Sequence, residues 1–80
     1  MINYTVYTKP TCTYCNAMKR DLDNRGIPYN EVDLTQDEEA LEKVSALFSS
    51  APVLEVVNGK RRRYYDWASY RSADIGGGWD

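Results

Sequence analysis

The sequence predicts an α/β fold whose elements follow the order β-α-β-α-β-β-α. Three observations support it: an alternating apolar segment at the N-terminus, two later segments in which apolar residues recur at helical spacing, and an Asn-Gly pair between two strand-like segments. Eighty residues allow one compact domain, which we expect to span residues 1–80.

The first half of the chain is predicted to form a strand, a helix and a second strand. Over residues 2–8, β-branched and aromatic residues alternate in the manner of a strand. Pro10 is disfavoured in a helix interior, and apolar residues then recur at helical spacing over residues 13–25. Gly26 favours the left-handed backbone that ends many helices. Residues 29–34 are predicted to form the next strand.

A second helix is predicted to begin near Glu38. Thr35 and Glu38 resemble a capping box, in which two side chains bond to the backbone at the start of a helix. The apolar stripe of this helix is expected to be buried, and it comprises Ala40, Leu41, Val44, Leu47 and Phe48.

A β-hairpin is predicted around Asn58-Gly59, because this dipeptide is the strongest short-range signal for a tight turn. Its first strand begins at Pro52, and its second covers residues 60–65. The four consecutive basic residues of the second strand suit a solvated edge strand and could also steer an acidic partner. A last helix is expected from Trp67 to about residue 74, before the glycines at 76–78.

Composition excludes several classes of function. The net charge is −2 and both signs are mixed along the chain, so no nucleic-acid partner is expected. No apolar run approaches the roughly 20 residues of a membrane span, and the N-terminus lacks a basic segment followed by an apolar one. We therefore expect a soluble, cytoplasmic monomer without a membrane partner.

Cys12 and Cys15 are the only cysteines, and the chain has no histidine. Cys12 falls at the junction of a strand and a helix, where unpaired backbone N–H groups can receive an anionic sulfur, and Cys15 lies about one helical turn further. This spacing lets the two sulfurs meet. The pattern favours a redox-active dithiol in which Cys12 attacks a disulfide of the partner and Cys15 resolves the mixed disulfide.

Two other interpretations of the cysteine pair stay open. Zinc takes four ligands, so a metal site would need a symmetric dimer or added carboxylates. A purely structural disulfide would close a loop of only four residues and would constrain little chain entropy. We expect neither a metal nor a cofactor.

The segment VYTKPTCTYC, the later APV and the element order together resemble the glutaredoxin branch of the thioredoxin superfamily. The resemblance covers nearly the whole chain. It implies a thioredoxin fold, with a four-stranded mixed sheet flanked by three helices, and a redox-active Cys12–Cys15 disulfide. It also implies a cis peptide bond before Pro52, which would turn the Ala51 backbone toward a bound peptide.

Within that branch, the segment from Trp67 to Arg71, followed by Asp74, is similar to the Trp-Ser-Gly-Phe-Arg-Pro-Asp segment of NrdH-type redoxins. These short proteins take electrons from thioredoxin reductase and pass them to ribonucleotide reductase. The resemblance therefore implies these two enzymes as partners. This chain departs from the pattern at Ser69 and Tyr70, and no proline follows Arg71.

Glutathione is the competing partner. Glutaredoxins bind it through a basic residue before the motif, the motif tyrosine, the backbone beside the cis-proline and a later Gly-Gly…Asp segment. The first three are present here, but KRRRYYDW stands where the glycines would be. We therefore favour a protein partner over a glutathione-dependent glutaredoxin, and a non-enzymatic module that binds a metal or cluster across a dimer is a third possibility. The residues expected to contact the partner are Lys9, Thr13, Tyr14, Ala51, Pro52, Trp67 and Arg71.

Overall fold

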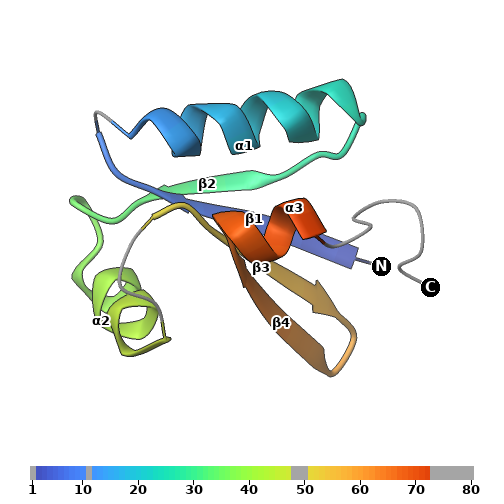
Figure 1. The fold of residues 1–80 in the computed structure, drawn as a ribbon. Helices are drawn as coiled ribbons and strands as arrows, with labels where there is room; N and C mark the ends of the chain where they lie inside the picture. Colours follow the sequence, from blue (N-terminus) through green and yellow to red (C-terminus); the bar gives the residue numbers. More distant parts are fainter. Residues whose placement is uncertain (1, 11, 48–50, 73–80) are drawn as a thin grey trace.

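The computed structural model describes residues 2–10, 12–47 and 51–72. Within these ranges the elements follow the predicted order (Figure 1). They are β1 (Ile2–Thr8), α1 (Thr13–Asn24), β2 (Asn30–Asp33), α2 (Glu38–Leu47), β3 (Val53–Asn58), β4 (Arg61–Asp66) and α3 (Trp67–Ser72). The predicted residues 73 and 74 of the last helix and the glycines at 76–78 lie outside the described residues.

The strands form one mixed sheet in the order β2-β1-β3-β4. β1 pairs in parallel with β2 and antiparallel with β3, and β3 pairs antiparallel with β4. Tyr7 lies opposite Val53, and Val53 lies opposite Asp66. The end of β1, the start of β3 and the end of β4 therefore meet at one end of the sheet, which we call the Val53 end.

Apolar side chains form one core cluster on each face of the sheet. α1 and α3 cover one face and α2 covers the other (Figure 1). The larger cluster includes the fully buried Met18 and Leu22 of α1 and Tyr70 of α3. Burying a side chain of Met or Leu size stabilises the folded state by about 1.5–3 kcal/mol. The second cluster packs Ala40 and Val44 of α2 against the sheet.

The hairpin turn and the cap of α2 differ from those predicted, whereas α1 and the strands lie within one residue of their predicted bounds. Asn58 pairs with Arg61, so the central residues of the hairpin turn are Gly59 and Lys60, one residue later than predicted. Gly59 has φ of +62°, which a residue without a Cβ adopts at little cost. At the start of α2 the capping oxygen belongs to Asp37, whose Oδ1 accepts from the backbone N–H of Ala40 at 3.0 Å.

The predicted cap residue Thr35 instead bonds to Asp33. Oδ1 of Asp33 accepts from both the backbone N–H and the hydroxyl of Thr35. This turn precedes α2 and does not cap it. The prediction of a fully buried stripe is also wrong in part, because Leu41 is 37% and Leu47 is 53% exposed. Phe48 lies outside the described residues.

A buried carboxylate lies on the α2 face of the sheet. Glu55 of β3 is only 7% exposed, and its oxygens accept hydrogen bonds from Lys43 Nζ at 2.7 Å and Tyr7 Oη at 3.3 Å. Arg62 Nε lies 3.6 Å away. Burial raises the pKa of Glu55, but hydrogen bonds from Lys43 and Tyr64 and the positive charges of Lys43 and Arg62 outweigh burial, so that the net pKa lies below its usual value.

We expect the ion pair of Glu55 to make the stability of the fold dependent on pH. Because the pKa of Glu55 is lower in the folded than in the unfolded chain, its contribution is present above the unfolded value near 4.5 and is lost as pH falls through the folded pKa. Glu55→Gln should lower the free energy of unfolding by about 1–2 kcal/mol at pH 7. Thermal melts from pH 7 to pH 3 should show this difference shrinking.

Glu42→Gln is the matched control, since Glu42 is an exposed carboxylate on α2. It should leave both the stability at pH 7 and its pH dependence nearly unchanged. Melting temperatures of the Glu55→Gln and unmodified proteins that fall in parallel from pH 7 to pH 3 would contradict the assignment.

Candidate redox site

Cys12 is the capping residue of α1. Its backbone is extended, with φ of −100° and ψ of 109°, and its Sγ accepts from the backbone N–H of Cys15 at 3.1 Å. Its carbonyl oxygen accepts from the backbone N–H of Asn16 at 3.3 Å. The sulfur therefore occupies the place that Ser or Asp oxygens take at other helix starts, where the helix dipole favours negative charge.

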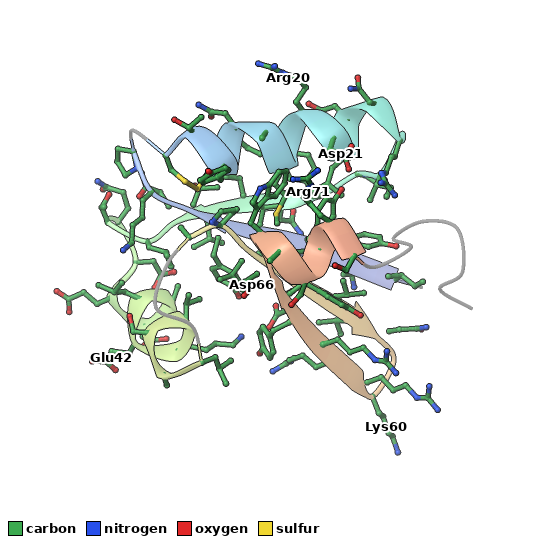
Figure 2. All side chains as sticks on the ribbon, viewed as in Figure 1. Arg20, Asp21, Glu42, Lys60, Asp66 and Arg71 are labelled. Carbon is green, nitrogen blue, oxygen red and sulfur yellow. A yellow bond between two sulfur atoms is a disulfide. The ribbon has the colours of Figure 1, made fainter. Side chains whose placement is uncertain are left out.

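Cys12 and Cys15 are joined by a disulfide, with their Cα atoms 5.2 Å apart (Figure 2). The two sulfurs differ in access, because Cys12 is half-buried whereas Cys15 is 1% exposed. An incoming group therefore meets Cys12 first. Within residues 2–10, 12–47 and 51–72, no three Cys, Asp or Glu side chains converge as ligands for a metal ion.

The peptide bond between Ala51 and Pro52 is cis, as the resemblance implies. Pro52 is buried and Ala51 is half-buried against the second core cluster. These residues directly precede Val53, which pairs with Tyr7, and the chain passes from β1 to Cys12 within a few residues. The proline segment and the dithiol segment therefore both leave the Val53 end of the sheet.

Three aromatic rings run from the dithiol along α3. The Tyr14 and Trp67 ring centroids are 5.9 Å apart with a tilt of 34°, and Trp67 stacks on Tyr70 at the same separation. Tyr14 is 59% exposed, Trp67 is half-buried and Tyr70 is buried. We call Tyr14, Trp67 and Tyr70 the aromatic series. It joins the first turn of α1, beside Cys12, to the one-and-a-half turns of α3.

Polar contacts fix both ends of α3. The hydroxyl of Tyr70 donates to Oδ2 of Asp21 on α1, which also pairs with Arg25 at 2.8 Å. Burial and the carboxylate of Asp21 raise the pKa of Tyr70, so this hydroxyl keeps its proton at neutral pH. At the start of α3, Oδ1 of Asp66 accepts from the backbone N–H of Ser69 at 2.7 Å.

The structure brings together some of the residues predicted from sequence. Arg71 lies over the Trp67 ring, 5.9 Å from its centroid, and Trp67 contacts Tyr14. Lys9, in the loop after β1, and Thr13, the first residue of α1, are both exposed and flank Cys12 along the chain. Sequence reasoning did not identify the Tyr70–Asp21 bond. The helical spacing of Trp67 and Tyr70 could have pointed to the stacked pair.

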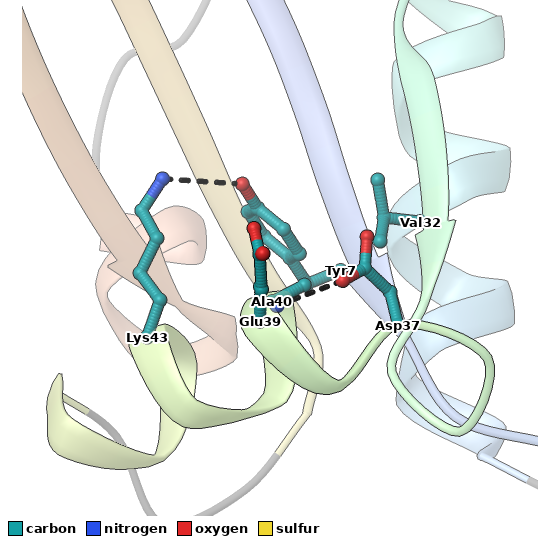
Figure 3. Close-up of a pocket in the computed structure, with 6 residues that line it drawn as sticks. All are labelled: Tyr7, Val32, Asp37, Glu39, Ala40 and Lys43. Atoms are coloured by element: carbon teal, nitrogen blue, oxygen red, sulfur yellow. Dashed lines mark hydrogen bonds between the residues drawn. The ribbon is translucent and has the colours of Figure 1, made fainter.

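The cavity in Figure 3 belongs to a different part of the molecule. It has a volume of about 290 Å³ and lies between α2 and the sheet. Lys43 reaches across it to the hydroxyl of Tyr7 at 3.5 Å, and the carboxylate of Asp37 bonds to Ala40. The lining side chains come from α2, the segment before it, β1 and β2, so this cavity lies on the sheet face opposite α1.

No helix of the described ranges is both long and apolar enough to cross a bilayer.

Comparison with known proteins gives consistent matches. The Glutaredoxin family model matches residues 4–61. The Gene 56 protein of Mycobacterium phage D29 is 40% identical over 52 residues, which are 62% of this chain and 58% of the phage protein. The match thus spans less than two thirds of that relative. Glutaredoxin-like protein NrdH of Lactococcus lactis is 37% identical over 51 residues, 62% of this chain and 71% of that protein.

A solved structure extends the likeness to the fold. The glutaredoxin-like protein NrdH-redoxin of Escherichia coli, described as having a thioredoxin-like activity profile, is 32% identical with a TM-score of 0.64. The match covers 76% of this chain and 79% of that one. Together with the sheet order and the three helices, this confirms the predicted thioredoxin fold.

Proposed function

The chain belongs to the glutaredoxin family, and from this premise we propose that it is a thiol–disulfide oxidoreductase that reduces protein disulfides through Cys12 and Cys15. The observation that carries the proposal is the asymmetry of the pair. Cys12 caps α1 with an accessible sulfur that accepts a backbone hydrogen bond, whereas Cys15 is buried one turn further along the helix.

The reaction follows from this asymmetry. In the reduced protein, the Cys12 thiolate attacks one sulfur of the substrate disulfide, and the other substrate sulfur leaves as a thiolate and takes up a proton. The Cys15 thiolate then attacks Cys12 Sγ, which re-forms the Cys12–Cys15 disulfide and releases the second substrate thiol. Two electrons and two protons pass to the substrate. The N–H of Cys15, which donates to Cys12 Sγ in the disulfide form, is placed to stabilise the anionic sulfur of reduced Cys12 before attack.

We propose a protein partner for this chemistry: thioredoxin reductase as the electron source and ribonucleotide reductase as the acceptor, in the reducing cytoplasm. Support comes from the two NrdH relatives and from the segment that replaces the glycines of glutathione-binding glutaredoxins. There β4 continues without a loop into α3, and the carboxylate of Asp66 caps that helix. The Tyr14 ring also contacts the Trp67 ring. Lys9, Thr13, Ala51, Pro52 and Arg71 are proposed as further contacts of the docked partner.

The choice of electron donor can be tested directly. The oxidised protein is supplied with NADPH and thioredoxin reductase, or with NADPH, glutathione reductase and glutathione, and NADPH consumption is followed with insulin or oxidised ribonucleotide reductase as the acceptor. We expect turnover with thioredoxin reductase at least about tenfold faster than with glutathione, a difference of about 1.4 kcal/mol. Turnover with glutathione alone would reverse the assignment in favour of a glutathione-dependent glutaredoxin.

A further inference from the structure

Building on the oxidoreductase function above, we propose that the outer edge of β4 binds an acidic, extended segment of the partner protein, the same segment that carries the substrate disulfide. β4 is the last strand of the sheet, so its outer backbone groups have no strand beside them among the described residues. Its first half is strongly basic, with Arg61, Arg62 and Arg63 following Lys60 at the turn.

The three arginines are not equivalent. Arg62 points to the α2 face, where Glu55 lies 3.6 Å from its Nε. Arg63 lies opposite Val56, a member of the larger core cluster, so Arg61 and Arg63 point to the face that α1 and α3 cover. Both are exposed, and neither forms an ion pair with any residue in the described ranges. Two like charges on one face of a strand repel each other unless an anion lies nearby.

Arg61 and Arg63 lie on the same sheet face as the dithiol. From Arg63, β4 runs to Asp66 at the Val53 end, and the next residue, Trp67, contacts Tyr14 beside Cys12. Two carboxylates of this region are already engaged, Asp66 with the N–H of Ser69 and Asp21 with Arg25 and Tyr70. Figure 2 shows Lys60 at the tip of the hairpin and Asp66 nearer the helices.

The geometry specifies the substrate. One strand residue spans about 3.3 Å, so Arg63 and Arg61 lie roughly 10 and 17 Å from the Asp66 position along β4. These spans correspond to about three and five positions of an extended segment. Allowing about one to three further positions for the stretch from Asp66 past Trp67 to Cys12, a segment whose disulfide rests at Cys12 would place its acidic residues about four to eight positions from the reactive cysteine. Negative side chains there would neutralise Arg61 and Arg63, and the backbone of the segment could pair with the outer edge of β4.

The test uses synthetic peptides with one internal disulfide. One peptide carries a block of Glu and Asp about four to eight residues before the nearer cysteine, and a second carries it the same distance after that cysteine. In the matched neutral peptides, Gln and Asn replace Glu and Asp. Pre-reduced protein is mixed with each peptide, and released peptide thiols are measured in single turnover. We expect one acidic peptide to react about tenfold faster than its neutral counterpart at low salt, and this advantage to vanish near ~0.5 M NaCl.

The double variant Arg61→Glu/Arg63→Glu should lose this advantage and reduce the neutral peptides at the unchanged rate. For a matched change of net charge, Arg63→Glu is compared with Arg20→Glu, since Arg20 projects from the far side of α1 (Figure 2). We expect only Arg63→Glu to slow the acidic peptide. Circular dichroism and thermal melts establish that all variants fold.

Three results would overturn the docking proposal. The first is an equal rate of reduction for acidic and neutral peptides, and the second is equal slowing of acidic-peptide reduction by Arg20→Glu and Arg63→Glu. The third is that an oligonucleotide inhibits acidic-peptide reduction as strongly as a disulfide-free acidic peptide of equal charge, which would show unselective anion binding. If the unmodified protein reduces neither kind of peptide, the oxidoreductase function itself fails. The two failures are therefore distinguishable.

Discussion

Cys12→Ser is expected to abolish disulfide reduction, with a loss of at least about a thousandfold in the single-turnover rate. A serine hydroxyl is not appreciably ionised near neutral pH and does not attack sulfur, so no mixed disulfide can form. Cys12 is also the more accessible sulfur of the pair, because Cys15 is 1% exposed. Released thiols are measured with a small uncharged disulfide and with insulin, so that loss of docking cannot be mistaken for loss of chemistry.

The variant should remain folded. The lost disulfide closes only a four-residue segment, which constrains little of the unfolded chain, and serine is itself a good helix-capping residue. A melting temperature close to that of the reduced unmodified protein is the control. Full activity of this variant would contradict the assigned role of Cys12.

Cys15→Ser is expected to trap the reaction halfway. Cys12 can still attack, but the chain then has no second thiol to displace the bound substrate. A mixed disulfide between Cys12 and the substrate should therefore accumulate. Intramolecular positioning gives effective concentrations of roughly 10⁵–10⁸ M in the best-oriented systems, and the variant loses that advantage. Mass spectrometry under non-reducing conditions should show protein plus one substrate chain, and dithiothreitol should release it.

The control for trapping is Cys12→Ser, which should form no adduct with the same substrate. A buried hydroxyl at position 15 costs some stability, so Cys15→Ala serves as a second variant and should trap the same species. Normal turnover without an adduct in both Cys15 variants would show that another group resolves the intermediate.

Signals that are local in sequence predicted the order of the elements well. The alternation in residues 2–8, the helical spacing in residues 13–25 and the stop at Gly26 each depend on residues only a few positions apart. The structure places α1 within one residue of the predicted bounds. The hairpin turn and the cap were each misplaced by one or two residues, because neighbouring residues suit the same role: Lys60 takes the turn position predicted for Asn58, and Asp37 takes the capping position predicted for Thr35.

Features that join distant segments were not predictable in the same way. Glu55 appears among the apolar residues of β3, and nothing in its neighbourhood along the chain indicates that Lys43 lies on the facing helix. The exposure of Leu41 likewise depends on how much of the sheet α2 covers. At the site, the spacing of Cys12 and Cys15 predicted their contact, but the packing of Tyr14 on Trp67 required the register of the whole sheet.

The strand order also determines what a nascent chain looks like as it leaves the ribosome. β1 is made first, yet its antiparallel neighbour β3 begins only at Val53, and α3 comes later still. At about 5–20 residues per second, both thiols wait a few seconds before the central sheet can close. Until the sheet closes, the packing that buries Cys15 is incomplete, and its completion leaves Cys12 as the accessible sulfur. The order of synthesis therefore sets when Cys12 becomes the more accessible of the two sulfurs.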